Sequence, residues 1–507
     1  MRVERYTWIL LLVLLTALSR SCYEEVVVPE ALNGDEAPCL MKLDGVPVFE
    51  DVIDRMALFT LPEDSLEAFS PTVEFNSYEG IAFNGINLRH GEVNELGAVR
   101  INQAYELIAS NGDQIDTFRM MFTTIPLLRI LHTKAIPWEP KVESWLQLQY
   151  GDKAGNKPST ILFESDAGIE YRGITANKFE KRAYGIELWE NKFREDQSVP
   201  LLGMAYGEDW ILDAMYIDKL RMRNKVSFEI WNSMNTSAPG KSETRTGIRM
   251  EYVELFLNQR YQGIYCLGEK MDEKFIDFAD SQDEKGGLMY KTYGNNDGST
   301  TFFSYDSEPP GPDIEWDGWE QIFPDKVVSW DPLIDLRKLV TMEEDENFVS
   351  GIGTVLDLDN VANFYLFLNL IMGWDNTGKN VFLARYDQDS KFFFIPWDLE
   401  ATWGRNWMME DQKPNGIVFN GLYDRLIELN AGAFSDNISV IWSDYRSNVF
   451  QRETLTQRFG KQYELLEKNG VIQRENLRWD LDLDLDEEYL YISDWIEKRL
   501  EVLDSNF

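Results

Sequence analysis

The chain has 507 residues, which is too long for a single hydrophobic core, so two or three domains are expected. Hydrophobic residues make up 44% and aromatic residues 13%, so the chain can bury such cores and is not intrinsically disordered. The 49 Lys and Arg residues are outnumbered by 87 Asp and Glu residues, and the net charge of −38 argues against nucleic acid as a broad surface partner.

The N-terminus has the layout of an export signal. Arg2 and Arg5 precede an apolar run from Trp8 to Leu18, and small residues follow. This run is too short to span a bilayer comfortably and is typical of a secretory signal. We therefore expect residues 1–22 to be a signal peptide and the rest of the protein to be exported.

The end of this signal resembles that of a bacterial lipoprotein. Cys22 follows Ser21 where a lipidated cysteine would stand, although Arg20 disturbs the usual pattern. The resemblance implies a membrane anchor on Cys22 and a tether over 23–39, and the alternative is a simple cleaved signal with an incidental cysteine. The acidic pair Glu24 and Glu25 resembles the tethers of surface lipoproteins in Gram-negative bacteria, so an outer-membrane or cell-surface location is expected.

Cysteine and histidine are scarce, which narrows the chemistry. The chain has only Cys22, Cys39 and Cys266, too few for a disulfide framework or a Cys-rich zinc module. His90 and His132 are its two histidines, so a Ser-His-Asp triad or a His-ligated metal is disfavoured. Any reaction has to depend on carboxylates, amides and cationic side chains.

Residues 40–119 read as short extended segments with period-two alternation, broken by turns such as Asn111–Gly112. This pattern predicts an antiparallel, Ig-like β-sandwich. No residue in it suggests catalysis, and we interpret it as a spacer or adhesive module. The remaining residues, 120–507, are expected to form a second, larger α+β unit.

Within this unit, strands and helices alternate. A helix is predicted over 214–234, and Asn258–Gln259 should turn a hairpin over 249–272. Residues 292–325 read as an irregular insertion, and Asp359 is a plausible N-cap of a buried helix. Further strands are predicted over 125–131, 145–150, 160–165, 169–173 and 183–188, and helices over 453–470 and 491–505. The acidic run 480–488 is interpreted as a solvated face in preference to a calcium site.

One group of polar residues carries chemical meaning. Asp375 and Asn380 are spaced Asp-x-x-x-x-Asn after the buried helix, and Asp398 follows a predicted hairpin. Asp398 and Glu400 lie in the apolar stretch IPWDLEATWG, where charge is costly unless it is compensated. Protein kinases use an Asp, an Asn five residues later and a second Asp after a short hairpin to orient the acceptor hydroxyl and bind Mg²⁺.

Three segments together resemble the spore-coat-protein-H-like (CotH) kinase family. They are 169–188 (IEYRGITANKFEKRAYGIEL), 252–272 (YVELFLNQRYQGIYCLGEKMD) and 360–404, which ends in IPWDLEATWG. The resemblance implies that 120–507 is an atypical protein-kinase-like domain with a β-rich N-lobe and a helical C-lobe. It also implies ATP and Mg²⁺ or Mn²⁺ as cofactors, and transfer of the γ-phosphate to Ser or Thr hydroxyls of a protein substrate.

The resemblance assigns roles to single residues, residue by residue. Asp375 corresponds to the catalytic Asp, and Asp398, Asn380 and Glu400 to metal ligands. Nucleotide contacts are assigned to the loop that begins at Arg172 and Gly173 and to Glu269. Lys181 would pair with the phosphates, and Lys291 is an alternative cation for the same role. Glu269 is open to two interpretations, an ion-pair partner or a strand residue whose backbone alone meets adenine.

Two positions depart from the family pattern. Glu400 replaces a second Asp, and 174–176 (Ile-Thr-Ala) replaces a polar loop. The alternative function is therefore a non-catalytic surface lipoprotein that uses the kinase-like scaffold for binding or assembly. Glycoside hydrolysis is disfavoured because the two acids lie two residues apart on one strand, whereas glycosidase carboxylates flank the bond from separate elements.

Overall fold

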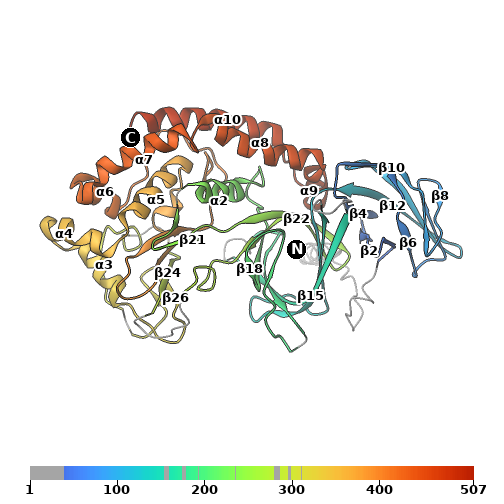
Figure 1. Cartoon of the computed structure of the whole chain (residues 1–507), viewed down its shortest axis with the longest axis horizontal. Coiled ribbons are helices and arrows are strands. Elements are labelled where there is room, and N and C mark those ends of the chain that lie inside the picture. The colour runs from blue at the N-terminus through green and yellow to red at the C-terminus, as the bar shows by residue number, and fades with distance from the viewer. Residues whose placement is uncertain are drawn as a thin grey trace, which may run out of the picture.

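A computed structural model describes residues 39–507 except 153–158, 174–177, 192, 235, 279–285, 295–297 and 310. The predicted signal peptide, Cys22 and all but the last residue of the tether lie outside these residues. Figure 1 shows three parts in a row: an N-terminal group of sheets, a β-barrel, and a helical part with its own sheet. In the described part, no helix is long and apolar enough to cross a membrane.

The first part consists of sheets that share one apolar core, which includes Val48, Phe59, Phe83, Leu107 and Phe122. Pairing is antiparallel except between β4 and β12. One sheet has the order β2 (Val46–Pro47), β1 (Lys42–Leu43), β6 (Thr72–Glu74), β9 (Glu92–Val93). The other has the order β3 (Phe49–Asp51), β4 (Met56–Thr60), β12 (Gln114–Thr123), β11 (Tyr105–Asn111), β7 (Gly80–Phe83), β8 (Ile86–Asn87), and β5 (Ser65–Phe69) pairs with β10 (Gly97–Arg100). The boundary predicted at 119 therefore falls inside β12.

This first part is packed firmly on the barrel. Asp51 is fully buried, and its carboxylate accepts hydrogen bonds from the Arg260 guanidinium at 3.0 Å and from the backbone N–H of Tyr261 at 3.0 Å. The rings of Phe49 and Phe256 meet edge to face with centroids 5.8 Å apart. A buried charged hydrogen bond together with aromatic packing fixes the two parts against each other.

The second part is a closed barrel with the strand order β13-β14-β15-β16-β19-β23-β22. Only the pairing of β13 with β22 is parallel. Its strands are β13 (Leu127–His132), β14 (Val142–Asp152), β15 (Ser159–Arg172), β16 (Ala183–Trp189), β19 (Asp209–Asp213), β22 (Met250–Leu257) and β23 (Arg260–Glu269). Two pairs of short strands lie outside the barrel: β17 (Val199–Pro200) with β18 (Tyr206–Gly207), and β20 (Ser237–Ala238) with β21 (Lys241–Arg245). The hairpin predicted at Asn258–Gln259 is confirmed by β22 and β23.

The helix predicted over 214–234 is wrong in its first half, because α2 spans only Arg223–Ser233. Asp218 explains the difference. Its carboxylate accepts hydrogen bonds from the backbone N–H groups of Leu220, Met222 and Arg223 at 2.7–2.9 Å. Aspartate side chains that bind nearby backbone N–H groups compete with helix formation, and this one holds 218–222 as a turn in front of the helix.

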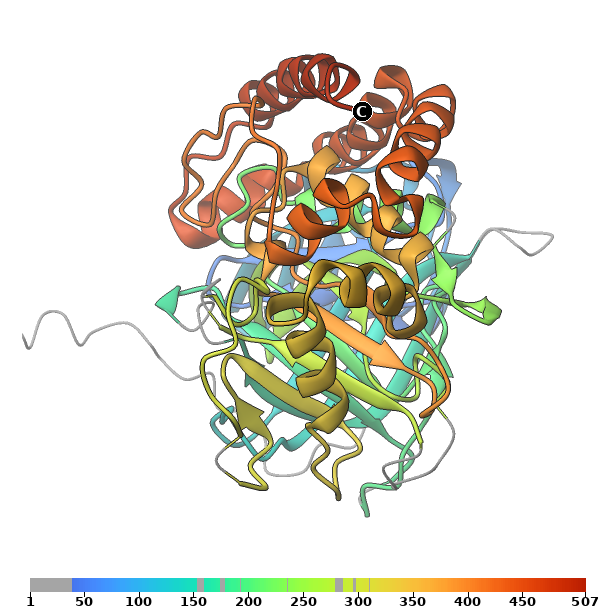
Figure 2. The same cartoon turned by 90° about the vertical axis from the view of Figure 1, so that its left-hand side faces the viewer.

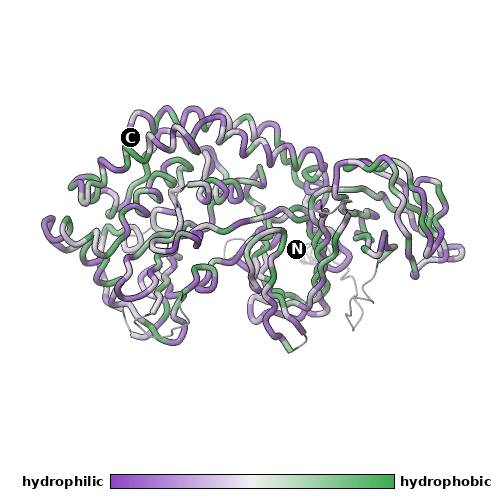
Figure 3. The backbone as a smooth tube through the Cα atoms, viewed as in Figure 1, coloured by the Kyte–Doolittle hydropathy of each residue, from purple (hydrophilic) through white to green (hydrophobic). Residues whose placement is uncertain are grey.

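The third part has a sheet of order β25-β26-β24-β27-β28 covered by helices (Figure 2). Its strands are β24 (Leu288–Thr292), β25 (Glu315–Trp316), β26 (Trp319–Phe323), β27 (Val381–Arg385) and β28 (Phe393–Pro396). Its helices are α3 (Asp331–Thr341), α4 (Asp345–Val355), α5 (Leu358–Ile371), α6 (Gly421–Glu428), α7 (Phe434–Ser447), α8 (Arg452–Lys468), α9 (Val471–Trp479) and α10 (Leu485–Asp504), with 3-10 turns η3 (Asp375–Thr377) and η4 (Ala431–Ala433). In Figure 3, hydrophilic and hydrophobic residues alternate along α8 and α10, as expected for helices with one buried face.

Two local predictions in this part need correction, and a third is confirmed. The N-cap of α5 is Asp357, whose side chain accepts the N–H of Asn360, and not Asp359. Residues 292–325 are not wholly irregular, because β25 and β26 extend the sheet. The prediction that the acidic run 480–488 is solvated is confirmed, because each of its acids except Glu488 is exposed. Asp484 caps α10, and the acids that follow lie in its first turn, where negative charge stabilises the helix dipole.

Glu50, on β3, predicts a pH dependence of stability. It is 2% exposed and accepts a hydrogen bond from Gln259, and burial raises its pKa to about 7. Because the folded pKa exceeds the unfolded one, the stabilising contribution of the protonated form is present below pH ~4.5 and is lost as the pH rises through 7. Glu50→Gln should raise the free energy of unfolding at pH 8 by up to about 3 kcal/mol and have little effect at pH 4.5.

Urea denaturation at the two pH values measures this difference. Glu63→Gln, at an exposed site of the same part, is the matched control and should be neutral at both. An equal effect of Glu50→Gln at pH 4.5 and 8 would contradict the buried, titrating carboxyl.

Candidate active site

The β27–β28 hairpin brings together Asn380, which precedes it, and Asp398, which follows it. Val381 pairs with Pro396, so the residues on either side of the hairpin leave the sheet next to each other. The backbone N–H of Trp397 donates to the Asn380 carbonyl at 3.0 Å. Asp398 follows at once, and its carboxylate therefore lies near Asn380, eighteen residues earlier in the chain.

Asn376 joins the Asp375 turn to this hairpin. Its buried amide donates to the carbonyl of Trp397 at 2.7 Å and to that of Asn380 at 3.2 Å. Asp375, Asn380 and Asp398 are consequently held in one hydrogen-bonded unit. Asn380 and Asp398 have φ angles of 56° and 52°, a left-handed conformation that is uncommon outside glycine and concentrates at functional sites.

The barrel contributes a further carboxylate, Asp213 at the end of β19. The side chain of Asn224, on α2, donates to Asp213 Oδ2 at 2.8 Å and accepts from the backbone N–H of Leu399 at 3.0 Å. Asn224 is 8% exposed, so this bridge is shielded from water. It fixes Asp213 beside the segment that carries Asp398 and Glu400.

The carboxylates in this group oppose one another. Although Asp398 keeps contact with solvent, protein atoms crowd its carboxylate, and this desolvation together with Asp213 and Asp375 raises its pKa to about 6. Desolvation and the charges of Asp213 and Asp398 raise the pKa of Glu400 well above its usual range. A hydrogen bond with Asp213 acts in the same direction on the pKa of Glu400.

Two cations lie over the ring of Trp397, the residue before Asp398. The Arg172 guanidinium, at the end of β15, lies 5.4 Å from the ring centroid, and Lys291 Nζ, on β24, lies 6.0 Å from it. Burial lowers the pKa of both cations, while Asp398 acts on each to favour the charged form. The structure thus brings predicted residues Arg172 and Lys291 to the acids, and exposed Gly173 ends the strand beside Arg172 with a φ of 84°.

Lys181 lies elsewhere. Its ammonium group is fully buried, 2.6 Å from the Glu475 carboxylate, and lies over the ring of Tyr265. Burial lowers the pKa of Lys181 to about 8, and Glu475 counteracts part of this effect. A side chain without solvent contact cannot meet a phosphate in this arrangement, so Lys181 links the barrel to α9 and the predicted phosphate contact is not formed.

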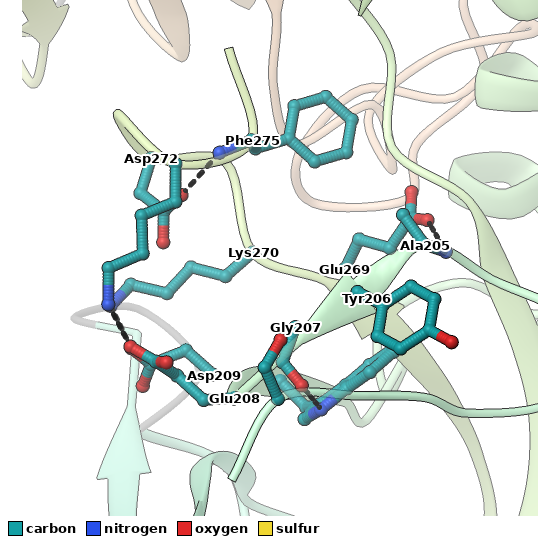
Figure 4. Close-up of a pocket in the computed structure, with 12 residues that line it drawn as sticks. Ala205, Tyr206, Gly207, Glu208, Asp209, Glu269, Lys270, Asp272 and Phe275 are labelled. Atoms are coloured by element: carbon teal, nitrogen blue, oxygen red, sulfur yellow. Dashed lines mark hydrogen bonds and ion pairs between the residues drawn. The ribbon is translucent and has the colours of Figure 1, made fainter. Parts of the chain in front are cut away.

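Glu269 is also remote from the acids. It pairs across the sheet with Trp210, three residues along β19 from Asp213, or about 10 Å. Its carboxylate accepts from Arg245 at 2.9 Å and from the backbone N–H of Ala205 at 2.7 Å (Figure 4). Of its two predicted interpretations, the ion pair is the one that its side chain forms.

Glu269 lines a small cavity of about 80 Å³ at this end of the barrel. Its wall is highly charged, with an ion pair between Lys270 and Asp209 at 3.0 Å (Figure 4). The lining residues are Ser198, Ala205, Tyr206, Gly207, Glu208, Asp209, Trp210, Glu269, Lys270, Asp272, Lys274 and Phe275.

The donor set suits a hard divalent cation. Asp213, Asp398 and Glu400 offer carboxylate oxygens, which Mg²⁺ and Mn²⁺ prefer, and a cation would relieve the repulsion that raises the pKa values of Asp398 and Glu400. These side chains do not form a finished cage. Among the residues that the structure describes, no three His, Cys, Asp or Glu side chains are arranged as a metal site. The residues fit the ion in chemical type, and ligation requires their side chains to reorient.

Sequence reasoning missed three residues of this site. Asp213 ends an apolar strand, as Asp398 does, and that shared pattern could have marked it. Asn224 and Asn376 are not marked by any motif in the sequence. The bridging roles of Asn224 and Asn376 depend on partners 175 and 21 residues away in the chain, which no local pattern reveals.

The position of Lys181 predicts a structural role. Lys181→Met leaves the Glu475 carboxylate buried with Arg221 as its remaining ionic partner, and should lower the free energy of unfolding by about 2–4 kcal/mol. Urea denaturation measures the loss, with exposed Lys178→Met as a neutral control. Unchanged stability combined with lost nucleotide binding would contradict the structural role and support the predicted phosphate contact of Lys181.

Comparison with known proteins agrees with the resemblance noted in the sequence. The model of the family described as CotH kinase protein matches residues 169–503, about two thirds of the chain, and this range includes every residue of the site. The chain is 24% identical over 242 residues to the inner spore coat protein H of Bacillus subtilis (strain 168). That match covers 48% of this chain and 60% of the relative, so the chain spans less than two thirds of the relative's length. The chain belongs to the CotH kinase protein family.

Proposed function

We propose that this chain is an atypical protein kinase that transfers the γ-phosphate of ATP to Ser or Thr hydroxyls of a protein. One observation carries the proposal: Asp398 belongs to a group of carboxylates with Asp213 and Glu400, and it also acts on two cations, Arg172 and Lys291, that lie over the ring of neighbouring Trp397. Acids that need a counter-ion, next to cations that need an anion, are complementary to a metal–phosphate group.

Each residue has a task in this proposal. Asp398 and Glu400, with Asp213 and the predicted ligand Asn380, would hold Mg²⁺ or Mn²⁺. The bound ion supplies positive charge that neutralises phosphate oxygens. Arg172 and Lys291 bind the phosphates from the other side and orient them, and the Trp397 ring between them limits access of water.

Asp375 orients the acceptor. It is half-buried, and desolvation raises its pKa while Lys379 counteracts the effect. A carboxylate with a raised pKa is a better acceptor for the hydroxyl proton of Ser or Thr. In this proposal the barrel acts as the N-lobe and the helical part as the C-lobe of a kinase-like arrangement, with Asp375 on the C-lobe side.

The place of action is also a proposal. The relative's name assigns that protein to a spore coat, and the present chain begins with an expected export signal. We propose that it acts on proteins of the cell surface or a coat layer. An anchor on Cys22 and a Gram-negative outer membrane stay predictions.

Nucleotide binding is the first test. ATP with Mg²⁺ or Mn²⁺ should raise the melting temperature of the protein by a few degrees, because ligand at 100 times Kd adds about 2.7 kcal/mol to the native state. Asp398→Asn, Arg172→Ala and Lys291→Ala should each remove most of the shift. Arg182→Ala, which removes a different cation, next to Lys181 in the sequence, is the matched control and should keep the shift. A shift that needs no metal, or that survives all three substitutions, would place the nucleotide elsewhere.

Transfer is the second test. With ³²P-labelled ATP and surface-protein extracts as acceptors, Asp375→Asn should lower the rate of labelling at least about 100-fold. The ATP-dependent thermal shift of the same variant should be unchanged, because Asp375 is outside the proposed metal set. A thermal shift without any transfer by the wild type would favour the alternative, a non-catalytic scaffold. The observation that favours this non-catalytic alternative is that, among the described residues, no group of side chains is arranged as a metal site.

A further inference from the structure

Three aromatic side chains from separate segments form a row of ring contacts that starts at Trp374, the residue before Asp375. The Trp374 ring, directly before Asp375, meets the Phe419 ring edge to face with centroids 5.5 Å apart. Phe419 in turn meets Phe303 with centroids 6.3 Å apart. Phe303 is 52% and Phe419 51% exposed, so half of each ring faces solvent. We refer to Trp374, Phe419 and Phe303 as the aromatic shelf.

The backbone under the aromatic shelf is fixed by hydrogen bonds. The Asn420 side chain donates to the Thr377 carbonyl at 3.0 Å and so ties Phe419 to the Asp375 turn. The backbone N–H of Gly421 donates to the Thr301 carbonyl at 2.8 Å and ties it to the segment of Phe303. A Cβ on Gly421 would lie 2.0 Å from a backbone oxygen, so this close approach requires glycine. The exposed rings are therefore held in place, which favours a binding surface over a loose loop.

We infer that the aromatic shelf docks an aromatic or large aliphatic side chain of the acceptor polypeptide, near its Ser or Thr. This inference rests on the proposed function, because Asp375 marks where the hydroxyl would lie. Interface anchors of this kind are aromatic or aliphatic side chains that fill preformed apolar surfaces. The shelf supplies such a surface within one residue of the proposed catalytic Asp.

Charge indicates the rest of the acceptor segment. Exposed Asp306 follows Phe303 by three residues, and Asp375 adds another carboxylate. The whole chain has a net charge of −38, which attracts cationic polypeptides over distances set by the ionic strength. An acceptor segment with Lys or Arg around its apolar anchor is complementary to this surface.

A second copy of the chain fits the shelf less well. Two half-exposed rings and the partly buried Trp374 offer roughly 200–300 Å², far below the ~800 Å² per partner of a standard stable interface. A single side chain of a peptide matches this area.

Peptide binding tests the inference without nucleotide. Lysine-rich peptides with one central Ser are compared in pairs that carry Phe or Ala at each position up to three residues from the Ser. By fluorescence anisotropy with the full chain, the best Phe peptide should bind about tenfold more tightly than its Ala partner, as expected for one partly buried ring. Phe419→Ala and Phe303→Ala should each remove most of this preference. Phe193→Ala, at an aromatic residue 87% exposed elsewhere, should retain it.

Peptide binding, sedimentation and the thermal shift together decide whether the aromatic shelf docks the acceptor. Equal binding of Phe and Ala peptides to the wild type, or a preference kept in both shelf variants, would overturn the inference. A dimer by sedimentation that Phe419→Ala dissociates would also overturn it, since a second copy would then occupy the shelf. A preserved Phe preference in a protein that shows no ATP-dependent thermal shift would leave the docking surface standing and reject the kinase proposal.

Discussion

Electrostatic repulsion among Asp213, Asp398 and Glu400 is the constraint on which the rest of the site depends. Burial and the neighbouring carboxylates raise the pKa values of Asp398 and Glu400. Such a group is unfavourable in an isolated fold, and it is held together by neutral amides. Asn224 binds Asp213 to the Leu399 backbone, and Asn376 binds the turn of Asp375 to the hairpin. The amides hold the acids in place without neutralising them, which leaves their charge available for a ligand.

The C-terminal helices α9 and α10 fix the barrel relative to the segment that carries Asp398 and Glu400. Glu475, on α9, receives Lys181 and Arg221 from the barrel part at 2.6 and 3.1 Å. Glu488, on α10, pairs with Arg223 at the start of α2 and with Arg405 beyond the Glu400 segment. Buried ion pairs add little net stability but penalise any arrangement that separates them. They therefore fix the relation between the barrel residues and the Asp398 segment, far from the site itself.

The sequence was most informative where the determinants are local. The spacing of Asp375, Asn380 and Asp398 around a hairpin was enough to predict that they converge, and the family followed from three segments. The sequence could not predict which cation lies near the acids, because Arg172, Lys181 and Lys291 are all cationic and no local pattern distinguishes them. In the folded protein, Lys181 is buried against Glu475, and this burial excludes it from the group of cations near the acids. The start of α2 and the cap of α5 were missed for a similar reason, since several nearby acids could bind the free N–H groups.

The central claim is that the opposed carboxylates hold a divalent cation, and Mn²⁺ binding followed by electron paramagnetic resonance tests it most directly. At pH 7.5 and moderate salt, one Mn²⁺ per chain should bind, and Asp398→Asn or Asp213→Asn should abolish binding. Affinity should fall as the pH decreases through about 6, where protons compete for Asp398. Asp482→Asn, in the exposed acidic run, should leave binding unchanged. No Mn²⁺ binding at pH 7.5, or binding that ignores Asp398 and Asp213, would contradict the account.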